Sequence, residues 1–327
     1  MKFNNKENLR FGINQIKMNK MNWKNSIAII VLALSSTFTF AQSNLLNAKT
    51  PDQIGKKSAA ELSADNDKPL PYGYVHDRDI LMGKRTWEII DLDERVNFPL
   101  YFPVDGDVMS SSNRIPLYNV LINNIRNGKI TEVYDSSYFT TKKTLEDIES
   151  SLFTVDTSSA GVTEFNNDYD AYKKGEKILD EEFIRKTELE ARDVKDYRVV
   201  GYWYFDKRQG ELKYRLLGIC PVLIDVFSKK DGSEDPEYNE LFWVYFPAAR
   251  DILHSAKAFN DRNSAMGFTF DHLLNARRFN GVIYQEENVY GDRLIKDYMK
   301  ENAQMQLLES ERVKEKIRDF EQDMWNY

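Results

Sequence analysis

Residues typical of catalytic and metal centres are scarce in this chain. It contains one cysteine and three histidines among 327 residues. A single cysteine excludes an intramolecular disulfide framework and a cysteine-rich zinc site. The histidines, His76, His254 and His272, are too few and too scattered for a zinc motif or a Ser-His-Asp arrangement. The sequence therefore predicts no catalytic residue, no metal site and no cofactor.

Sequence motifs for nucleotide binding and for nucleophilic hydrolysis are also missing. No GxxxxGK[ST], GxGxxG or GxSxG occurs. Acidic residues outnumber basic ones, 52 to 45, which argues against bulk binding to nucleic acid. The chain is nevertheless 42% apolar and 13% aromatic, enough to form a folded core. These numbers predict an acidic globular protein with no nucleic-acid partner.

Two polar features could carry chemistry, and a structural explanation is favoured for each. Cys220 is either a nucleophile or a buried thiol at the end of an apolar strand, and the absence of a nearby histidine favours the buried thiol. Asp251 and His254 could share one helical face as a ligand pair, but exposed polar residues of a helix have the same spacing.

Acidic pairs and aromatic clusters leave similar alternatives. The acidic pairs could bind calcium or act as general acid and base, but none continues into a twelve-residue calcium loop, so a solvated surface is favoured. The aromatic clusters could stack on sugars, although core packing is the more common role. The pairs are Asp77 and Asp79, Asp91 and Asp93, and Asp105 and Asp107; the clusters are residues 202–205 and 242–243.

The first 41 residues resemble an export signal. Lys17, Lys20 and Lys24 precede an apolar run at residues 27–40 that is too short to span a bilayer stably. Thr39-Phe40-Ala41 resembles a cleavage site, which predicts a chain that begins at residue 42 with 39 basic and 51 acidic residues. The residue directly after this site is Gln42 and not a cysteine that could carry a lipid. No later stretch is apolar enough for a membrane helix. An exported, soluble protein is expected.

The remaining sequence predicts an α+β fold. Residues 42–71 have few large apolar side chains and are expected to form a flexible N-terminal arm. Residues 72–327 form the folded domain, with two possible subdomains at 72–195 and 196–327. The pattern predicts a helical N-terminal half, an antiparallel sheet centred on a hairpin in the C-terminal half, and a long amphipathic C-terminal helix.

The expected elements follow from apolar spacing and from turn and cap residues. Helices are predicted at residues 77–96, at 116–127, after Thr144, around 178–194, near Ile252 and Leu253, and at 292–325 with one possible break. Strands are predicted at residues 130–134, 197–205, 211–216 and 241–246, the second and third joined by a turn at 206–210, and residues 154–167 are expected to form a loop.

The C-terminal helix has an apolar stripe amid dense mixed charge. Such a stripe either packs on its own domain or binds a partner. The candidate partner-binding residues are Leu294, Tyr298, Met305, Leu308, Ile317, Phe320 and Met324.

Four segments carry a resemblance to a known family. They are residues 69–74 (PLPYGY), 86–103 (TWEIIDLDERVNFPLYFP), 202–221 (YWYFDKRQGELKYRLLGICP) and 240–250 (ELFWVYFPAAR). In order and spacing they resemble the gliding-motility protein GldN, called PorN in non-gliding relatives, and its close paralogue GldO. These are components of the type IX secretion system of Bacteroidetes. The likeness runs from about residue 69 to the C-terminus.

The resemblance implies a periplasmic, non-enzymatic scaffold associated with the outer membrane. Proteins of that family assemble with an outer-membrane lipoprotein, GldK or PorK, into a large ring and meet the periplasmic part of the inner-membrane protein GldM or PorM. Secretion and gliding depend on that ring. The family supplies no catalytic residue. The alternative is a periplasmic carbohydrate-binding or hydrolytic protein that uses exposed aromatic side chains and an acidic pair.

Overall fold

A computed structural model describes residues 67–104, 115–174, 177, 180–259, 268–300 and 302–325. Residues 67–327 form one compact unit. The predicted leader at residues 1–41 and the predicted arm up to residue 66 lie outside the described residues, as do Asp105 and Asp107.

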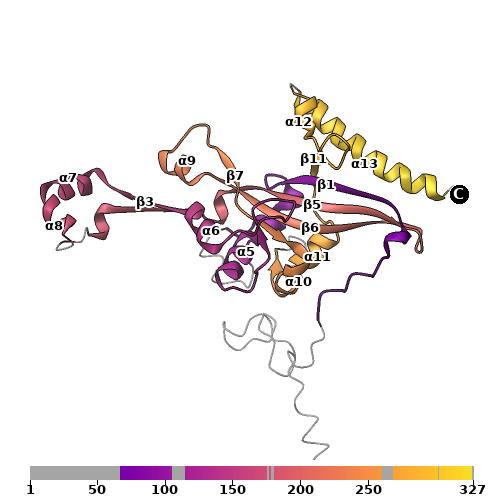
Figure 1. Cartoon of the computed structure of the whole chain (residues 1–327), viewed down its shortest axis with the longest axis horizontal. Helices are drawn as coiled ribbons and strands as arrows, with labels where there is room; N and C mark the ends of the chain where they lie inside the picture. The colour runs from indigo at the N-terminus through magenta and orange to yellow at the C-terminus, as the bar shows by residue number, and fades with distance from the viewer. Residues whose placement is uncertain are drawn as a thin grey trace, which may run out of the picture. The chain divides into compact units, whose positions relative to one another are not determined.

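An antiparallel sheet organises this unit (Figure 1). Within the described residues it has seven strands in the order β11-β1-β5-β6-β8-β2, and β7 pairs with β6 beside β8. The strands are β1 (Ile80–Asp91), β2 (Val133–Tyr134), β5 (Val194–Asp206), β6 (Glu211–Ile224), β7 (Tyr238–Glu240), β8 (Trp243–Tyr245) and β11 (Val282–Glu286).

The hairpin of β5 and β6 is the longest pairing in the sheet, and its prediction is confirmed. Apolar and polar side chains alternate along β6 from Leu212 to Leu216, as in a strand with one buried face. The turn closes at Gly210, whose φ of 66° lies in the left-handed region that glycine adopts without strain. The predicted strand around β8 is also confirmed, and β8 lies inside the sheet between β6 and β2.

The helix predicted at residues 77–96 is wrong, because most of this segment is strand β1. Three consecutive side chains, Thr86, Trp87 and Glu88, are fully buried. A surface helix buries one stripe and cannot cover three neighbours in a row, whereas a central strand is covered on both faces. The apolar spacing that suggested a helix belongs to a strand with covered faces. A 3₁₀ turn, η2 (Asp77–Asp79), precedes β1, and η3 (Arg95–Asn97) and α3 (Phe98–Tyr101) follow it.

Two further predictions are wrong between residues 153 and 193. The expected loop at 154–167 forms a strand and a helix. In place of the expected helix at 178–194, the described residues form a strand between two 3₁₀ turns, and the next strand begins at Val194. The strands at 153–157 and 184–188 pair with each other, and neither has enough apolar alternation to be recognised alone. The elements are β3 (Phe153–Thr157), α7 (Ser159–Asn167), α8 (Tyr169–Lys173), η4 (Glu181–Phe183), β4 (Ile184–Glu188) and η5 (Ala191–Asp193).

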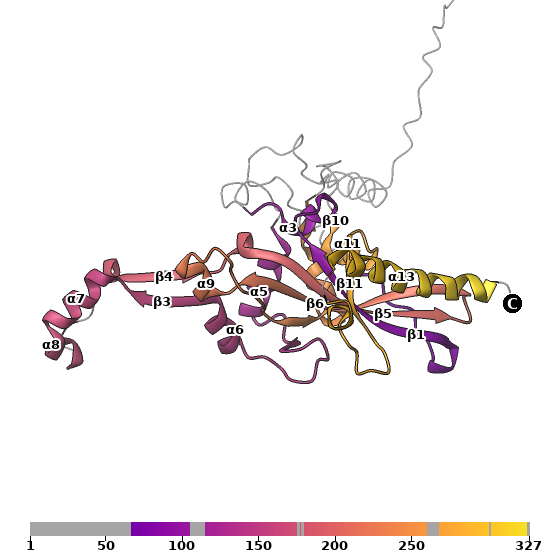
Figure 2. The same cartoon turned by 90° about the horizontal axis from the view of Figure 1, so that it is seen from above.

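We call residues 153–188 the outer hairpin. Figures 1 and 2 show it extending away from the central sheet, with α7 and α8 at its far end. Its base is held by α9 (Val226–Asp231), where the Lys230 ammonium lies 2.8 Å from the Asp156 carboxylate. Its two strands form a sheet of their own, separate from the central one.

Short helices pack against the main core, and several begin where the sequence predicts. Thr144 caps α6 (Leu145–Leu152) through a reciprocal capping box with Asp147. Pro116 is the N-cap of α5 (Leu117–Arg126), which buries its apolar face, and Pro247 lies in the first turn of α10 (Phe246–Ser255). α11 (Phe270–Asn275) packs on α10, and β9 (Lys257–Ala258) pairs with β10 (Phe268–Thr269).

The predicted C-terminal helix and its break are confirmed. α12 (Ile295–Tyr298) is followed by α13 (Ala303–Trp325), which runs along β11 and reaches β6. In the view of Figure 1, α13 runs above the strands, while α5, α10 and α11 lie below them. The α+β class is therefore confirmed. β1 and β2 bring residues from before 195 into the same sheet as the later strands, so the two predicted subdomain segments share one sheet.

Candidate functional site: the pocket beneath the C-terminal helix

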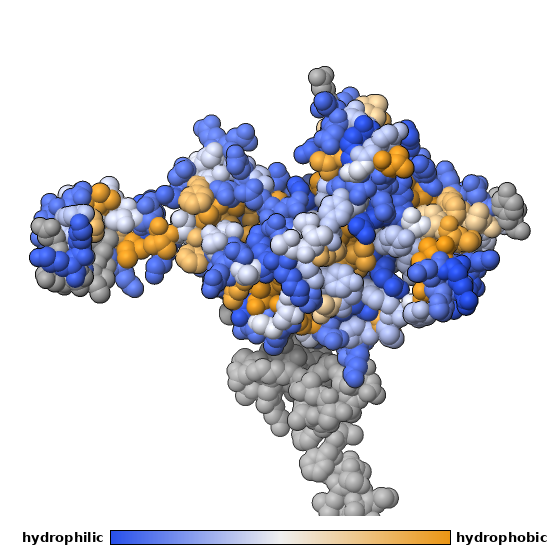
Figure 3. Space-filling view, in the orientation of Figure 1, coloured by the Kyte–Doolittle hydropathy of each residue, from blue (hydrophilic) through white to orange (hydrophobic). Residues whose placement is uncertain are grey.

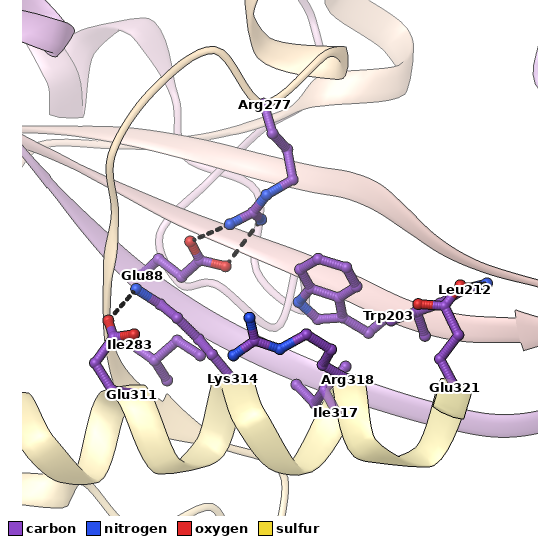
Figure 4. Close-up of a pocket in the computed structure, with 10 residues that line it drawn as sticks. All are labelled: Glu88, Trp203, Leu212, Arg277, Ile283, Glu311, Lys314, Ile317, Arg318 and Glu321. Carbon is purple, nitrogen blue, oxygen red and sulfur yellow. Dashed lines mark hydrogen bonds and ion pairs between the residues drawn. The ribbon is translucent and has the colours of Figure 1, made fainter. Parts of the chain in front are cut away.

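A pocket of about 340 Å³ lies between α13 and the strands beneath it (Figure 4). Four strands contribute one side chain each to it, the segment after α11 contributes Arg277, and α13 contributes the rest. The lining residues are Glu88, Trp203, Leu212, Ile283, Arg277, Glu311, Lys314, Ile317, Arg318 and Glu321.

Helix α13 is fixed over this pocket by a small set of contacts. Val313 and Ile317 are buried in a cluster with Ile283 of β11. The Ser310 hydroxyl, which is fully buried, accepts a hydrogen bond of 2.8 Å from the Ile283 backbone N–H. Farther along, the ring of Phe320 meets that of Phe205 edge-on, with centroids 6.0 Å apart. These contacts come from the middle and the C-terminal part of α13, so they determine how the helix lies on the strands.

A buried ion pair forms the floor of the pocket. Glu88 of β1 has no exposed surface, and Arg277 donates to its two carboxylate oxygens at 3.0 and 2.8 Å. Figure 4 shows the two groups facing each other in this bidentate geometry. A buried carboxylate is costly unless it is paired, so each member of the pair depends on the other.

Aromatic rings surround the Arg277 guanidinium. Its central carbon lies 4.1 Å from the ring centre of Tyr214 and 4.9 Å from that of Trp203. Burial lowers the pKa of Arg277, but the Glu88 carboxylate outweighs this effect and raises the pKa above its ordinary value. Burial also raises the pKa of the Tyr214 hydroxyl, and the nearby Glu88 carboxylate adds to the shift. Arg277 and Tyr214 therefore keep their charged and neutral forms, respectively, over the physiological range.

Close packing restricts the other side of the Glu88 carboxylate. A Cβ placed on Gly281 would lie 2.8 Å from Glu88 Oε2, closer than real side chains approach. Glycine at this position therefore lets the backbone pass close to the carboxylate. None of the sequence motifs predicts this site. One signal for it is present, since Glu88 is the single charged residue within the apolar run Trp87 to Ile90.

The side chains of the pocket are arranged to bind helix α13 and support its position. Glu88 is committed to Arg277, and Lys314 is paired with Glu311 of the same helix at 2.8 Å. The indole N–H of Trp203 is buried and has no hydrogen-bond partner among the described residues. The pocket wall combines this donor with charges of both signs. This arrangement can hold α13 in place.

The predicted partner-binding residues divide between the core and the surface. Ile317 is only 5% exposed and packs intramolecularly, so its stripe position serves this chain's own core. By contrast Leu308 is 62% exposed, and Met305 is exposed beside it. The others are half-buried: Leu294, Tyr298, Phe320 and Met324. Partner binding thus remains a prediction for the first turns of α13, around Met305 and Leu308.

The structure shows the surroundings of the other candidate residues, Cys220 and His254. Cys220 is a fully buried free thiol, and burial raises its pKa well above the ordinary value, so the interpretation as a structural thiol is confirmed. His254 does not pair with Asp251; its Nε2 lies 2.9 Å from Asp67, and its side chain is partly covered. Over the part of the chain that the structure describes, no group of three or more His, Cys, Asp or Glu residues could hold a metal ion.

The acidic pairs and aromatic clusters have structural roles where they are described. Asp79 lies 3.2 Å from the Arg208 guanidinium, and Asp91 accepts a hydrogen bond from the Asp93 backbone. In the aromatic clusters, Tyr204, Phe205, Phe242 and Trp243 are buried, while Tyr202 and Trp203 are half-buried.

The segment before β1 is also ordered by aromatic contacts. The ring of Tyr72 lies between two guanidinium groups, 4.2 Å from that of Arg250 and 4.5 Å from that of Arg215. Its hydroxyl donates to Asn275 at 2.8 Å. Arg250 is in turn paired bidentately with the buried Asp271. These contacts attach the segment before β1 to α10 and α11.

The family model for the gliding motility associated protein GldN matches residues 75–326, which include the pocket and the outer hairpin. The chain belongs to the GldN family. GldN-family proteins are associated with gliding motility, and this role applies to the present chain. No curated protein matches the chain in sequence. Among the described residues, none of the helices has both the length and the apolar character needed to cross a bilayer.

Proposed function

We propose that this GldN-family chain is a non-enzymatic structural subunit of the periplasmic ring of the type IX secretion and gliding machinery. It assembles with a GldK/PorK-like outer-membrane lipoprotein and contacts the periplasmic part of a GldM/PorM-like inner-membrane protein. The observation that carries this proposal is the family match, which spans nearly the whole folded body. The predicted export signal at residues 1–41 agrees with a location in the periplasm, next to the outer membrane.

The surface of the body supports a role in contacts rather than in chemistry. Among the described residues, large apolar side chains are exposed at several places, and neighbouring ones gather on the outer hairpin and at the start of α13. Exposed apolar patches of this kind are typical of protein–protein interfaces. Four titratable groups of the pocket beneath α13 are meanwhile used in ion pairs within the chain, Glu88 with Arg277 and Glu311 with Lys314.

Affinity purification tests the proposal directly. The full chain, tagged at its C-terminus, is purified from the membrane fraction of its native cells and examined by mass spectrometry and negative-stain imaging. The expected result is co-purification of an outer-membrane lipoprotein in ring-shaped particles. Recovery of a lone monomer whose melting temperature rises with added glycan would refute the proposal and favour a carbohydrate-binding protein.

A matched pair of variants locates the contact on α13. Leu308→Asp should reduce recovery of the lipoprotein at least tenfold, because a charge replaces an exposed apolar side chain at the proposed interface. Gln322→Asp changes an exposed residue of the same helix and should leave recovery unchanged. Equal recovery with both variants would remove this turn of α13 from the interface.

A further inference from the structure

The outer hairpin exposes apolar side chains on a ribbon of only two strands. Phe153 and Val155 lie on one face of β3 and are 46% and 53% exposed. On the opposite face, Asp156 is held by Lys230 of the helix beside it. Figure 3 shows hydrophobic residues on the surface of this projection. An isolated two-stranded ribbon is marginally stable in water, so a covering partner would stabilise it.

The far end of the outer hairpin adds to this surface. The ring of Phe165 meets that of Tyr169 with centroids 5.5 Å apart, and both side chains are exposed. Val162, on the same short helix as Phe165, is exposed as well. The apolar side chains therefore continue from the strands to the tip.

The charge of the outer hairpin is negative. Residues 153–188 contain nine acidic and five basic residues. Asp180, Glu181 and Glu182 follow one another on the surface, and none of them has an ion pair among the described residues. A partner for this element should offer basic groups next to an apolar contact.

The opposite end of the same body offers basic groups next to an exposed apolar side chain. The start of β1 and the turn between β5 and β6, residues 76–85 and 206–215, contain seven basic and four acidic residues. Leu81 is exposed there, and the Lys207 ammonium has no ion pair in the described part of the chain. We call these residues the hairpin tip. Figures 1 and 2 both place it at the end of the body opposite the outer hairpin.

We propose that the outer hairpin of one copy docks on the hairpin tip of a second copy, head to tail. This inference rests on the proposed function and deepens it by naming the two surfaces that meet. The acidic run of Asp180 to Glu182 faces the basic tip, and the apolar face at Phe153 and Val155 covers the region of Leu81. Two different surfaces at opposite ends form a heterologous contact, which repeats from copy to copy and closes into a ring when the rotation permits.

Cysteine cross-linking in native cells tests this arrangement. The full chain carrying Glu181→Cys together with Lys207→Cys is treated with a mild oxidant and separated without reductant. The native thiol of Cys220 is fully buried and should not form a disulfide in the folded chain. The expected result is a ladder of dimers, trimers and longer products. Each single-cysteine variant should give no product longer than a dimer, because one cysteine per copy cannot extend a chain of copies.

A second pair of variants separates docking from folding. Val155→Asp in the double-cysteine chain should reduce the ladder at least tenfold, whereas Val289→Asp, which makes the same change at an exposed loop residue, should not. Circular dichroism should show both variants folded.

The outcomes distinguish this inference from the function it rests on. Ring particles that contain the lipoprotein but give no ladder would overturn the head-to-tail contact and leave the proposed function standing. Efficient dimers from Glu181→Cys alone would overturn it in favour of contact between two outer hairpins, and a disulfide to the lipoprotein would assign the hairpin to that partner. Recovery of a lone monomer would overturn both.

Discussion

The buried pair of Glu88 and Arg277 makes the sharpest prediction about this fold. Replacing Glu88 with glutamine keeps the shape of the side chain but removes the charge that neutralises Arg277. Glu88 is fully buried and accepts two hydrogen bonds from the guanidinium, so the substitution leaves the Arg277 charge without its carboxylate partner. We expect Glu88→Gln to lower the free energy of unfolding by about 3 kcal/mol, the lower end of the range for breaking one side of a buried pair. The lower end applies because the Arg277 side chain keeps 23% exposure and its aromatic neighbours.

The reverse substitution should cost more. Arg277→Met leaves the Glu88 carboxylate buried and unpaired, for which we expect a loss of about 4 to 5 kcal/mol. The double variant removes both charges and should be much less unstable than the two single losses added together. A double-mutant cycle should therefore give a coupling energy of at least about 2 kcal/mol.

Urea unfolding followed by far-ultraviolet circular dichroism measures these differences. The dependence of the unfolding free energy on urea should stay unchanged, which shows that the variants unfold from the same compact state. A loss below about 1 kcal/mol for Glu88→Gln, or additivity of the two substitutions within about 0.5 kcal/mol, would refute the reasoning. Either result would mean that water or another group already screens the pair.

Three further substitutions or reactions test other parts of the structure. Burial raises the pKa of Asp196 to about 6, and its Oδ1 has no hydrogen-bond partner, so the folded chain loses stability as the pH rises from about 4 to 6 and this carboxyl ionises. Asp196→Asn should therefore raise the free energy of unfolding by about 2 kcal/mol at pH 7 and change it little at pH 4; equal gains at both pH values in urea titrations would contradict this. Ile317→Ala should cost about 2 to 4 kcal/mol, because it removes a buried side chain, whereas Leu308→Ala should change stability by less than about 0.5 kcal/mol; thermal melts compare the two, and similar losses would show that α13 packs differently. Cys220 should resist thiol reagents in the folded chain and react after unfolding, and rapid labelling of the native protein would show that the strand around it opens.

The parts of the fold that were predictable from sequence are those with strong local signals. The hairpin of β5 and β6 has alternating side chains and a glycine at its turn, and the helix after Thr144 has both halves of a capping box. The C-terminal helix has a long apolar stripe without proline or glycine. Each of these features lies within one continuous segment of the chain, so it can be recognised without knowledge of the rest of the fold.

The missed elements depend on contacts that are distant in the sequence. β1 resembles a helix by apolar spacing, and only its neighbours β5 and β11, which cover its two edges, make it a strand. β3 and β4 pair across the whole outer hairpin, and neither is apolar enough to be recognised alone. Propensity is overridden in these places by pairing with a partner that lies far along the chain.

The candidate site was predictable only in outline. The stripe on the C-terminal helix correctly marks a surface that packs, but it does not separate Ile317, which belongs to the core, from Leu308, which faces solvent. The ion pair was missed because Glu88 and Arg277 are brought together by the closing of the sheet. The sequence contains one indication of it, a single glutamate in an apolar run. This pattern predicts a buried charge but does not identify the residue that pairs with it.

The position of β1 between β11 and β5 also limits the order in which the sheet can form. Both neighbours of β1 follow it in synthesis, and one edge of the strand waits for β11, where Thr86 pairs with Glu286. Closing so long a loop is slow, because the entropy of the intervening chain is lost before the contact forms. An open strand edge is meanwhile a template for pairing with other chains. Until β11 is synthesised and pairs with it, this edge of β1 is therefore open to pairing with other chains.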